Sequence, residues 1–177
     1  MKKMLFPVTI AATLIFSAFT IFNAINWQIA EGYAVKFAGT DASGGFSKMT
    51  GDISFDETHI EASKMLVTIE VSSITTGNGM KNGHAKSGKW FDAKQFPTIT
   101  FRSNKFSKTA TGYAVDGTLD LHGVKKNITI PFTFAGNTFK GNFSVNRTDY
   151  GVGTMEGMSK RVSNKIKLDI TVPVTKK

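Results

Sequence analysis

The clearest regularity along the chain is an alternation of apolar and polar residues that begins at Trp27. In the stretch WQIAEGYAVKFAG the large apolar residues from Trp27 to Phe37 all fall on odd positions, as a strand with one buried face requires. The same period of two returns in seven further segments, whose apolar members are Ile53 and Phe55; Met65, Val67, Ile69 and Val71; Ile99 and Phe101; Tyr113, Val115, Leu119 and Leu121; Ile128, Ile130, Phe132 and Phe134; Phe139, Phe143 and Val145; and Ile166, Leu168, Ile170, Val172 and Val174. The alternation predicts eight strands.

Turn-forming residues separate nearly all of these segments, for example Gly44-Gly45 and Gly136-Asn137. Amphipathic strands joined by short turns are typical of an up-and-down antiparallel barrel or of a sandwich. The alternation is equally regular in the first and last segments, as expected if those two strands pair and leave no exposed edge. We therefore expect an all-β fold, an eight-stranded antiparallel β-barrel.

The exception to the period is MKNGHAKSGKWF, residues 80–91, where no alternation holds. Met80, His84 and Phe91 stand there at nearly helical spacing, which predicts a short helical segment or lid. Gly83 and Gly88 weaken this helix by about 1 kcal/mol each relative to alanine.

The first 24 residues have the composition of an export signal, with Lys2 and Lys3 followed by an uncharged apolar run that ends at Ala24. We expect an exported protein, in the periplasm or secreted, with one domain over residues 27–174. The rival interpretation is an uncleaved anchor over residues 4–24, because about 20 apolar residues can span a bilayer. The absence of cysteine excludes disulfides and thiol chemistry and is compatible with an oxidising compartment.

The chain is basic: removing Lys2 and Lys3 from its 22 Lys and Arg leaves 20 against 13 acidic residues, a net charge of +7. Such an excess of positive charge makes nucleic acid, anionic lipid and acidic polymers candidate partners. The lysines are scattered singly and form no block, and export makes nucleic acid an improbable target, so no nucleic acid partner is expected.

The sequence offers little catalytic chemistry. Its only histidines, His59, His84 and His122, show no pair at metal-ligand spacing, and neither a nucleophile elbow nor a phosphate-binding glycine loop is present. We expect no catalytic residue, no metal and no cofactor. An enzyme acting on a lipid or quinone, with His84 or His122 as general base, ranks last because no orienting acid is visible by spacing.

The chain has 15 Phe against two Trp and three Tyr, and the inward face that these residues would form has two interpretations. One is a packed core, since protein interiors are filled to crystal-like density. The other is a lined cavity, since an eight-stranded barrel is wide enough to hold one small ligand. The pattern alone leaves both open.

Several segments carry a family resemblance: SSITT (72–76), HAKSGKWFDAKQFPTITFRS (84–103), LDLHGVKKNITIPFTF (119–134) and NRTDYGVG (146–153). In order and spacing they resemble the signature segments of the YceI-like family of exported lipid-binding proteins, and the resemblance covers residues 27–174. It implies a lipocalin-like barrel around an apolar tunnel that holds a polyisoprenoid, an isoprenoid quinone or a fatty-acid-like lipid. Contact with a membrane surface and a homodimer are compatible with this family.

The resemblance also assigns candidate ligand-binding residues. Trp90 and Phe91 would close a short helix over the barrel, with His84 and Arg147 as further groups at the mouth. The tunnel would be lined by inward apolar side chains, namely Phe37, Phe55, Val67, Ile69, Phe101, Leu119, Phe132 and Phe143. The alternative function is an interaction module with a filled barrel, which docks to a membrane or a redox partner through surface lysine pairs such as Lys125-Lys126 and Lys176-Lys177.

Overall fold

The computed structural model describes residues 24–177, so the predicted export signal and anchor lie outside the described residues except for Ala24. The described part of the chain forms eleven strands, in order β1 (Asn26–Ile29), β2 (Ala34–Gly39), β3 (Ala42–Phe46), β4 (Met49–Ser54), β5 (Lys64–Glu70), β6 (Ile74–Thr75), β7 (Thr98–Thr109), β8 (Gly112–Leu121), β9 (Val124–Ala135), β10 (Thr138–Asn146) and β11 (Lys165–Lys176). It also forms one α-helix and four short 3₁₀ turns, α1 (Gly79–Lys86), η1 (Ile60–Ala62), η2 (Val71–Ser73), η3 (Arg147–Tyr150) and η4 (Gly157–Arg161).

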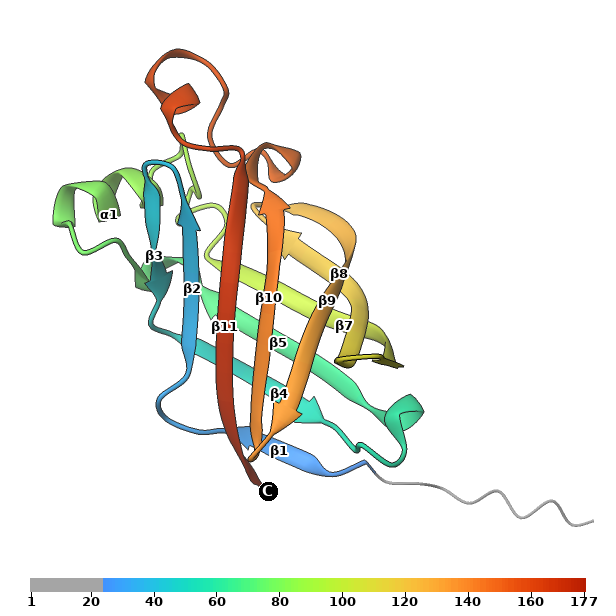
Figure 1. The fold of residues 1–177 in the computed structure, drawn as a ribbon. Coiled ribbons are helices and arrows are strands. Elements are labelled where there is room, and N and C mark those ends of the chain that lie inside the picture. Colours follow the sequence, from blue (N-terminus) through green and yellow to red (C-terminus); the bar gives the residue numbers. More distant parts are fainter. Residues whose placement is uncertain (1–23) are drawn as a thin grey trace, which may run out of the picture.

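The strands close into an antiparallel barrel, as the alternation predicts (Figure 1). Eight strands form the ring, in the order β1-β4-β5-β7-β8-β9-β10-β11, and β1 closes it by pairing with β11, with Trp27 opposite Lys176 and Ile29 opposite Val174. The remaining strands continue three of these eight beyond an interruption: β2 follows β1, β3 precedes β4 and β6 follows β5. The prediction of eight strands with a paired first and last strand is confirmed.

One glycine pair does not form the turn that its composition suggests. Gly44 and Gly45 lie inside β3, paired with Phe37 and Lys36 of β2. A side chain at Gly44 would collide with the Thr75 carbonyl and the Phe37 ring, and one at Gly45 with a carbonyl of β2. The glycines therefore permit a close approach of backbones within the wall, and the prediction of a turn there is wrong.

The predicted helical segment is present but shorter than expected, because α1 ends at Lys86 rather than at Phe91. Asn78 caps its first turn by accepting a hydrogen bond from the Lys81 amide at 3.0 Å. Ser87 ends it, since both its amide and its hydroxyl donate to the His84 carbonyl. Trp90 and Phe91 consequently lie in the turns after the helix.

Among residues 24–177 no helix is long and apolar enough to cross a bilayer.

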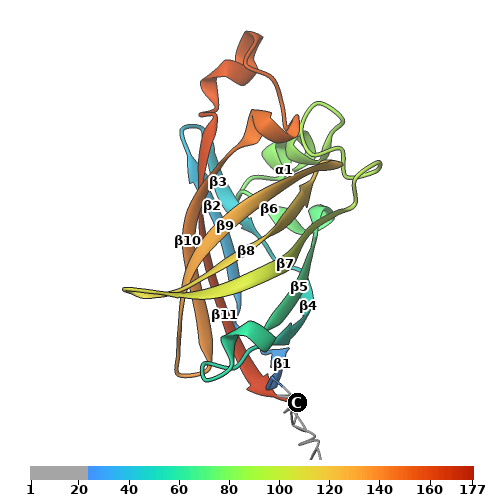
Figure 2. The same cartoon turned by 90° about the vertical axis from the view of Figure 1, so that its right-hand side faces the viewer.

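β1 and the C-terminus lie at one end of the barrel (Figures 1 and 2). A cluster of aromatic side chains around Phe55, which we call the plug, fills this end. Phe55 is its centre and is 1% exposed, with ring centroids 5.1 Å from Phe134 and 5.3 Å from both Tyr113 and Phe139. The Trp27 indole donates to the Phe55 carbonyl at 2.9 Å, so its polar atom is satisfied. Edge-to-face aromatic packing of this kind closes one end of the barrel.

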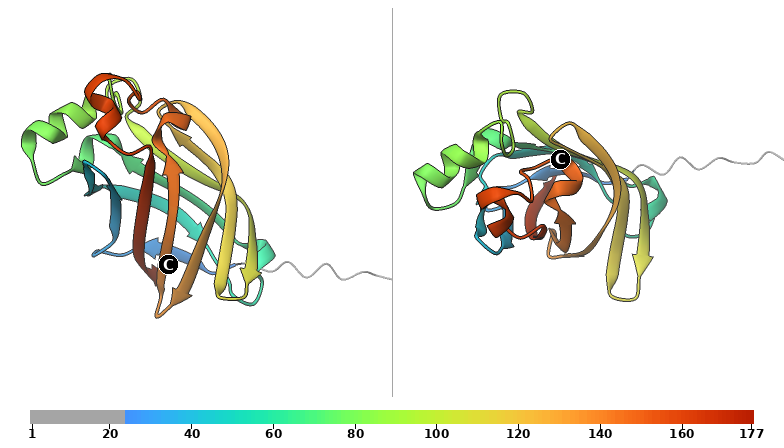
Figure 3. Two further views of the ribbon diagram at one scale, coloured as in Figure 1. Left: turned by 45° about the horizontal axis from the view of Figure 1, so that its top comes forward. Right: turned by 90° about the horizontal axis from the view of Figure 1, so that it is seen from above.

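The opposite end is built differently. The β2–β3 turn, α1 and the segment after β10, residues 147–164, gather there (Figures 1 and 3). The two ends of the barrel are therefore unequal, and the second one is the place where an interior space could open.

Candidate functional site

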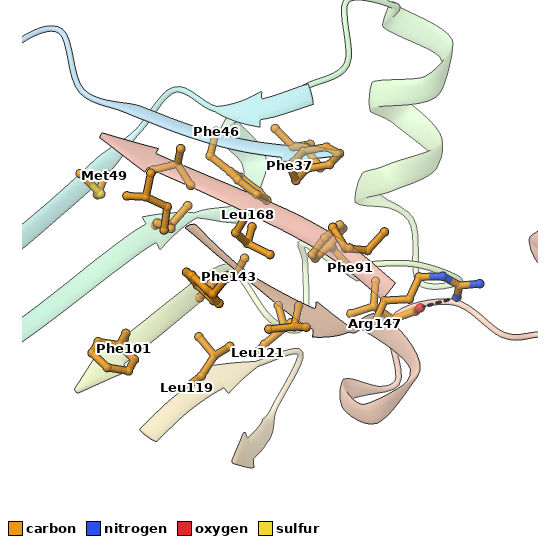
Figure 4. A pocket seen from close by; sticks show the side chains of 18 of the residues that line it. Phe37, Phe46, Met49, Phe91, Phe101, Leu119, Leu121, Phe143, Arg147 and Leu168 are labelled. Carbon is orange, nitrogen blue, oxygen red and sulfur yellow. Dashed lines mark hydrogen bonds between the residues drawn. The ribbon is translucent and has the colours of Figure 1, made fainter. Parts of the chain in front are cut away.

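A cavity of about 430 Å³ occupies the barrel between the plug and the opposite end (Figure 4). Its wall is apolar except for Asp41, Ser43, Thr76, Lys81, His84 and Arg147. The size and the lining are those of a site for a small apolar molecule, with few polar groups to orient it.

The middle of the barrel is hollow rather than poorly packed. Val67, Leu119, Phe143 and Leu168 point inward from different strands and line the cavity, yet each stays only partly buried. In a filled core such positions would be fully buried, as Phe55 is in the plug. The partial exposure of these side chains is therefore exposure to the cavity.

Most of the predicted tunnel residues surround this cavity. Seven of them line it, namely Phe37, Val67, Ile69, Phe101, Leu119, Phe132 and Phe143. Phe55 does not: the structure places it in the aromatic plug instead, where Phe132 and Phe139 separate the plug from the cavity. Inward alternation identified Phe55 as interior, but it could not tell at which level of the barrel the interior is hollow.

Other lining residues were missed by the sequence reasoning. Leu121, Phe139 and Leu168 line the cavity and lie on the inward face that the alternation identified, so that face contained the signal. Phe46 and Met49 also line it, but they belong to β3 and β4, where Gly44-Gly45 was taken for a turn.

The polar lining residues all belong to elements at the end of the barrel opposite the plug, which we call the mouth. Asp41 comes from the β2–β3 turn and Ser43 from β3. Thr76, Lys81 and His84 come from the stretch between the end of β6 and the end of α1, and Arg147 comes from η3. The predicted mouth residues His84, Trp90, Phe91 and Arg147 all line the cavity. A long apolar ligand in the cavity would thus have its tail toward the plug and a polar head group at the mouth.

Arg147 is a buried charge, 4% exposed, and no carboxylate of the described residues lies within 4.0 Å of it. Its guanidinium instead donates to five backbone carbonyls at 2.8–3.2 Å, those of Val152, Thr154, Ser159, Val162 and Ser163. It also lies 5.2 Å from the centroid of the Trp90 ring. Burial lowers the pKa of Arg147 from its usual value. All five carbonyls belong to residues 152–163, so Arg147 fastens this segment over the mouth.

Gly153 lets the segment pass over Trp90. Its φ is +65°, and a Cβ built there would lie 2.7 Å from the Trp90 ring and 2.9 Å from Arg147 Nη1. Gly157 offers a matched control, because its φ is +52° and nothing lies within 4 Å of such a Cβ.

We expect Gly157→Ala to cost roughly 1 kcal/mol of unfolding free energy, the strain of a left-handed alanine alone. Gly153→Ala should cost clearly more, about 2 kcal/mol or above, because the methyl group also displaces the indole. Urea unfolding of both variants measures the difference. Equal losses of stability in the two variants would mean that the methyl group at Gly153 can be accommodated beside Trp90 without cost.

The histidines do not form a metal site among residues 24–177. No three His, Cys, Asp or Glu side chains there could hold a metal ion. His84 is exposed at the mouth, whereas His122 packs on the Phe96 ring at 4.5 Å, with Nδ1 3.2 Å from the Tyr150 carbonyl. Since a carbonyl only accepts, Nδ1 carries the proton in this contact.

One surface lysine pair of the alternative function, Lys125-Lys126, lies beside η3 at the mouth, and the other, Lys176-Lys177, lies at the plugged end. Lys125 is 3.8 Å from Asp120, and Lys126 lies over the Tyr150 ring at 5.8 Å. Lys177 is 3.4 Å from Asp52 at the plugged end. Neither pair forms a free basic patch.

Comparisons with known proteins agree with the fold. Over 115 residues the chain is 39% identical to a UPF0312 protein of Vibrio vulnificus, a match that covers 64% of this chain and 58% of the Vibrio protein. The crystal structure of BcnA from Burkholderia cenocepacia superposes with a TM-score of 0.74 at 29% identity, covering 81% of this chain and 96% of BcnA. A polyisoprenoid binding domain from Saccharophagus degradans, implicated in plant cell wall breakdown, shares the fold with a TM-score of 0.63 at 16% identity, covering 87% of this chain and 99% of that domain.

A family model extends the likeness over nearly the whole described chain. The YceI-like domain model matches residues 24–174. This range includes the barrel, the cavity-lining strands and the segment that Arg147 holds. The chain belongs to the YceI-like family.

Proposed function

We propose that this protein is exported and holds a polyisoprenoid or a similar long-chain amphiphile in its cavity, as a carrier or a sequestering protein. The observation that carries the proposal is the hollow barrel with an apolar wall and a polar mouth. The polyisoprenoid binding domain of Saccharophagus degradans, which has the same fold, supports this ligand class. The composition of the first 24 residues supports export, with the periplasm as the expected location.

Binding would rest on the hydrophobic effect, about 25 cal/mol for each Å² of apolar surface that leaves water. The tail would lie along Val67, Leu119 and Phe143, with its end against Phe132 at the plug. No proton transfer or nucleophile is required, so the function is binding rather than catalysis.

The head group would lie at the mouth, near Lys81, His84 and Thr76. These side chains are compatible with a quinone, a carboxylate or a phosphate, because they offer donors and positive charge. The apolar wall discriminates ligands by length and width more than by chemical identity.

Native mass spectrometry of the purified protein, followed by organic extraction, tests the proposal. We expect an adduct with the mass of one long-chain amphiphile, which extraction removes and identifies. A protein that is recovered empty and takes up neither added isoprenoids nor fatty acids would contradict the proposal.

A further inference from the structure

Three large apolar side chains are exposed among residues 24–177, and all belong to two elements at the mouth. Met80, 75% exposed, is the second residue of α1, and Met155 and Met158, 49% and 76% exposed, lie on the segment that Arg147 holds. Single exposed apolar residues are ordinary, but a group around the opening of an apolar cavity indicates an interaction surface. Both elements lie at the same end of the barrel, and this segment projects further out than α1 (Figures 1 and 2).

The same two elements carry unneutralised positive charge. Residues 79–94 and 154–161, which we call the collar, contain six basic residues, Lys81, Lys86, Lys89, Lys94, Lys160 and Arg161, against two acidic ones, Asp92 and Glu156. None of these charges is within 4.0 Å of an opposite charge in the described part of the chain. The collar therefore combines flexible apolar side chains with a net charge of +4.

We infer that the collar docks on an anionic phospholipid bilayer, with Met80 and Met158 in the interface and the basic residues against the head groups. The inference rests on the proposed function, since a lipid chain could then pass between bilayer and cavity without crossing water. Basic residues beside interfacial apolar side chains fit an anionic membrane surface. A protein partner or a second copy of the chain would need a shaped apolar patch, which three separate methionines do not supply.

The test is co-sedimentation with vesicles of phosphatidylcholine alone and of phosphatidylcholine mixed with phosphatidylglycerol, at low and high salt. Two variants change the collar without touching the cavity lining: Met80→Ser with Met158→Ser, and Lys89→Glu with Lys160→Glu and Arg161→Glu. The control, Lys105→Glu with Lys108→Glu and Lys140→Glu, makes the same charge change at exposed residues elsewhere on the barrel. All proteins share the same N-terminal residues, so differences between them report on the collar.

We expect the unaltered protein to bind the anionic vesicles, and to bind them less at high salt. The charge-reversed collar should bind at least about tenfold more weakly and the methionine variant several-fold more weakly, while the control changes little. Equal losses in the control and in the charge-reversed collar would overturn the proposal, because general basicity would then explain the binding. Self-association that the methionine variant abolishes, without vesicle binding, would overturn it in favour of a second copy.

Native mass spectrometry of the same preparations separates the two proposals. If the protein retains lipid but does not bind vesicles, the docking proposal is contradicted and the proposed function is not. If the protein binds vesicles through the collar but never holds lipid, the proposed function is contradicted and the docking proposal is not.

Discussion

Replacement of Arg147 by methionine is expected to lower the free energy of unfolding by about 3 kcal/mol and to release the segment over the mouth. Methionine keeps the length and apolar body of the side chain but removes every donor. Up to five carbonyls, including those of Val152 and Ser159, would lose their only side-chain partner. A buried acceptor left without a donor costs roughly 1–3 kcal/mol, so the segment should open to water rather than keep several of them unpaired.

Two further variants distinguish the effect of the donor geometry of Arg147 from that of its positive charge. Arg147→Lys keeps the charge but offers one ammonium in place of a planar fork of donors, so an intermediate loss is expected. Arg161→Met removes an exposed arginine from the same segment and should change stability by less than about 0.5 kcal/mol. Urea unfolding gives the stabilities, and hydrogen exchange of residues 152–163 reports whether the segment opens. Full amide protection in Arg147→Met would show that the segment holds without its guanidinium.

The arginine also shows where reasoning from sequence stops. The stretch NRTDYGVG marked Arg147 as a residue of the mouth, through a family resemblance. Nothing in the stretch indicates that the charge would be satisfied by carbonyls rather than by a carboxylate. Those carbonyls lie 5 to 16 residues further along the chain, in a segment without alternation, so only the folded backbone brings them to one point.

The barrel itself was predictable because the alternation that causes it can be seen within each short segment of the sequence. A strand with one buried face must alternate, and regular first and last segments are best explained by their pairing, as Ile29 and Val174 show. Irregular backbone was harder to predict. Gly44-Gly45 has the composition of a turn, and only the crowding by Thr75 and Phe37 explains why glycine stands in a strand there.

The division of the interior into plug and cavity was not predictable for a related reason. Phe55 and Phe101 are both inward and both aromatic, so alternation treats them alike. The level at which each lies depends on the register of neighbouring strands and on their tilt. In the register observed, Phe101 pairs with Val67 and Leu119 beside the cavity, while Phe55 lies beyond the end of β4 among the rings of the plug.

If the hollow holds the lipid, then filling it should abolish binding without harming the fold. Val67→Phe places a ring into the cavity from β5, and Thr68→Phe places the same ring on the other side of the wall, because neighbouring residues of a strand point to opposite faces. We expect bound lipid per protein to fall roughly tenfold or more in Val67→Phe, a change worth about 1.4 kcal/mol or more, and to stay unchanged in Thr68→Phe.

The stability of the variants distinguishes lipid loss caused by filling the cavity from lipid loss caused by disruption of the fold. A ring that occupies empty space gains contacts, so Val67→Phe should unfold at the same temperature as the unaltered protein or a higher one when both are free of lipid. Leu168→Trp repeats the test from β11, on another side of the cavity (Figure 4). Lipid loss in the two cavity variants alone, at full stability, would place the ligand between these strands. Lipid that persists in both cavity variants would mean that the chain binds it elsewhere.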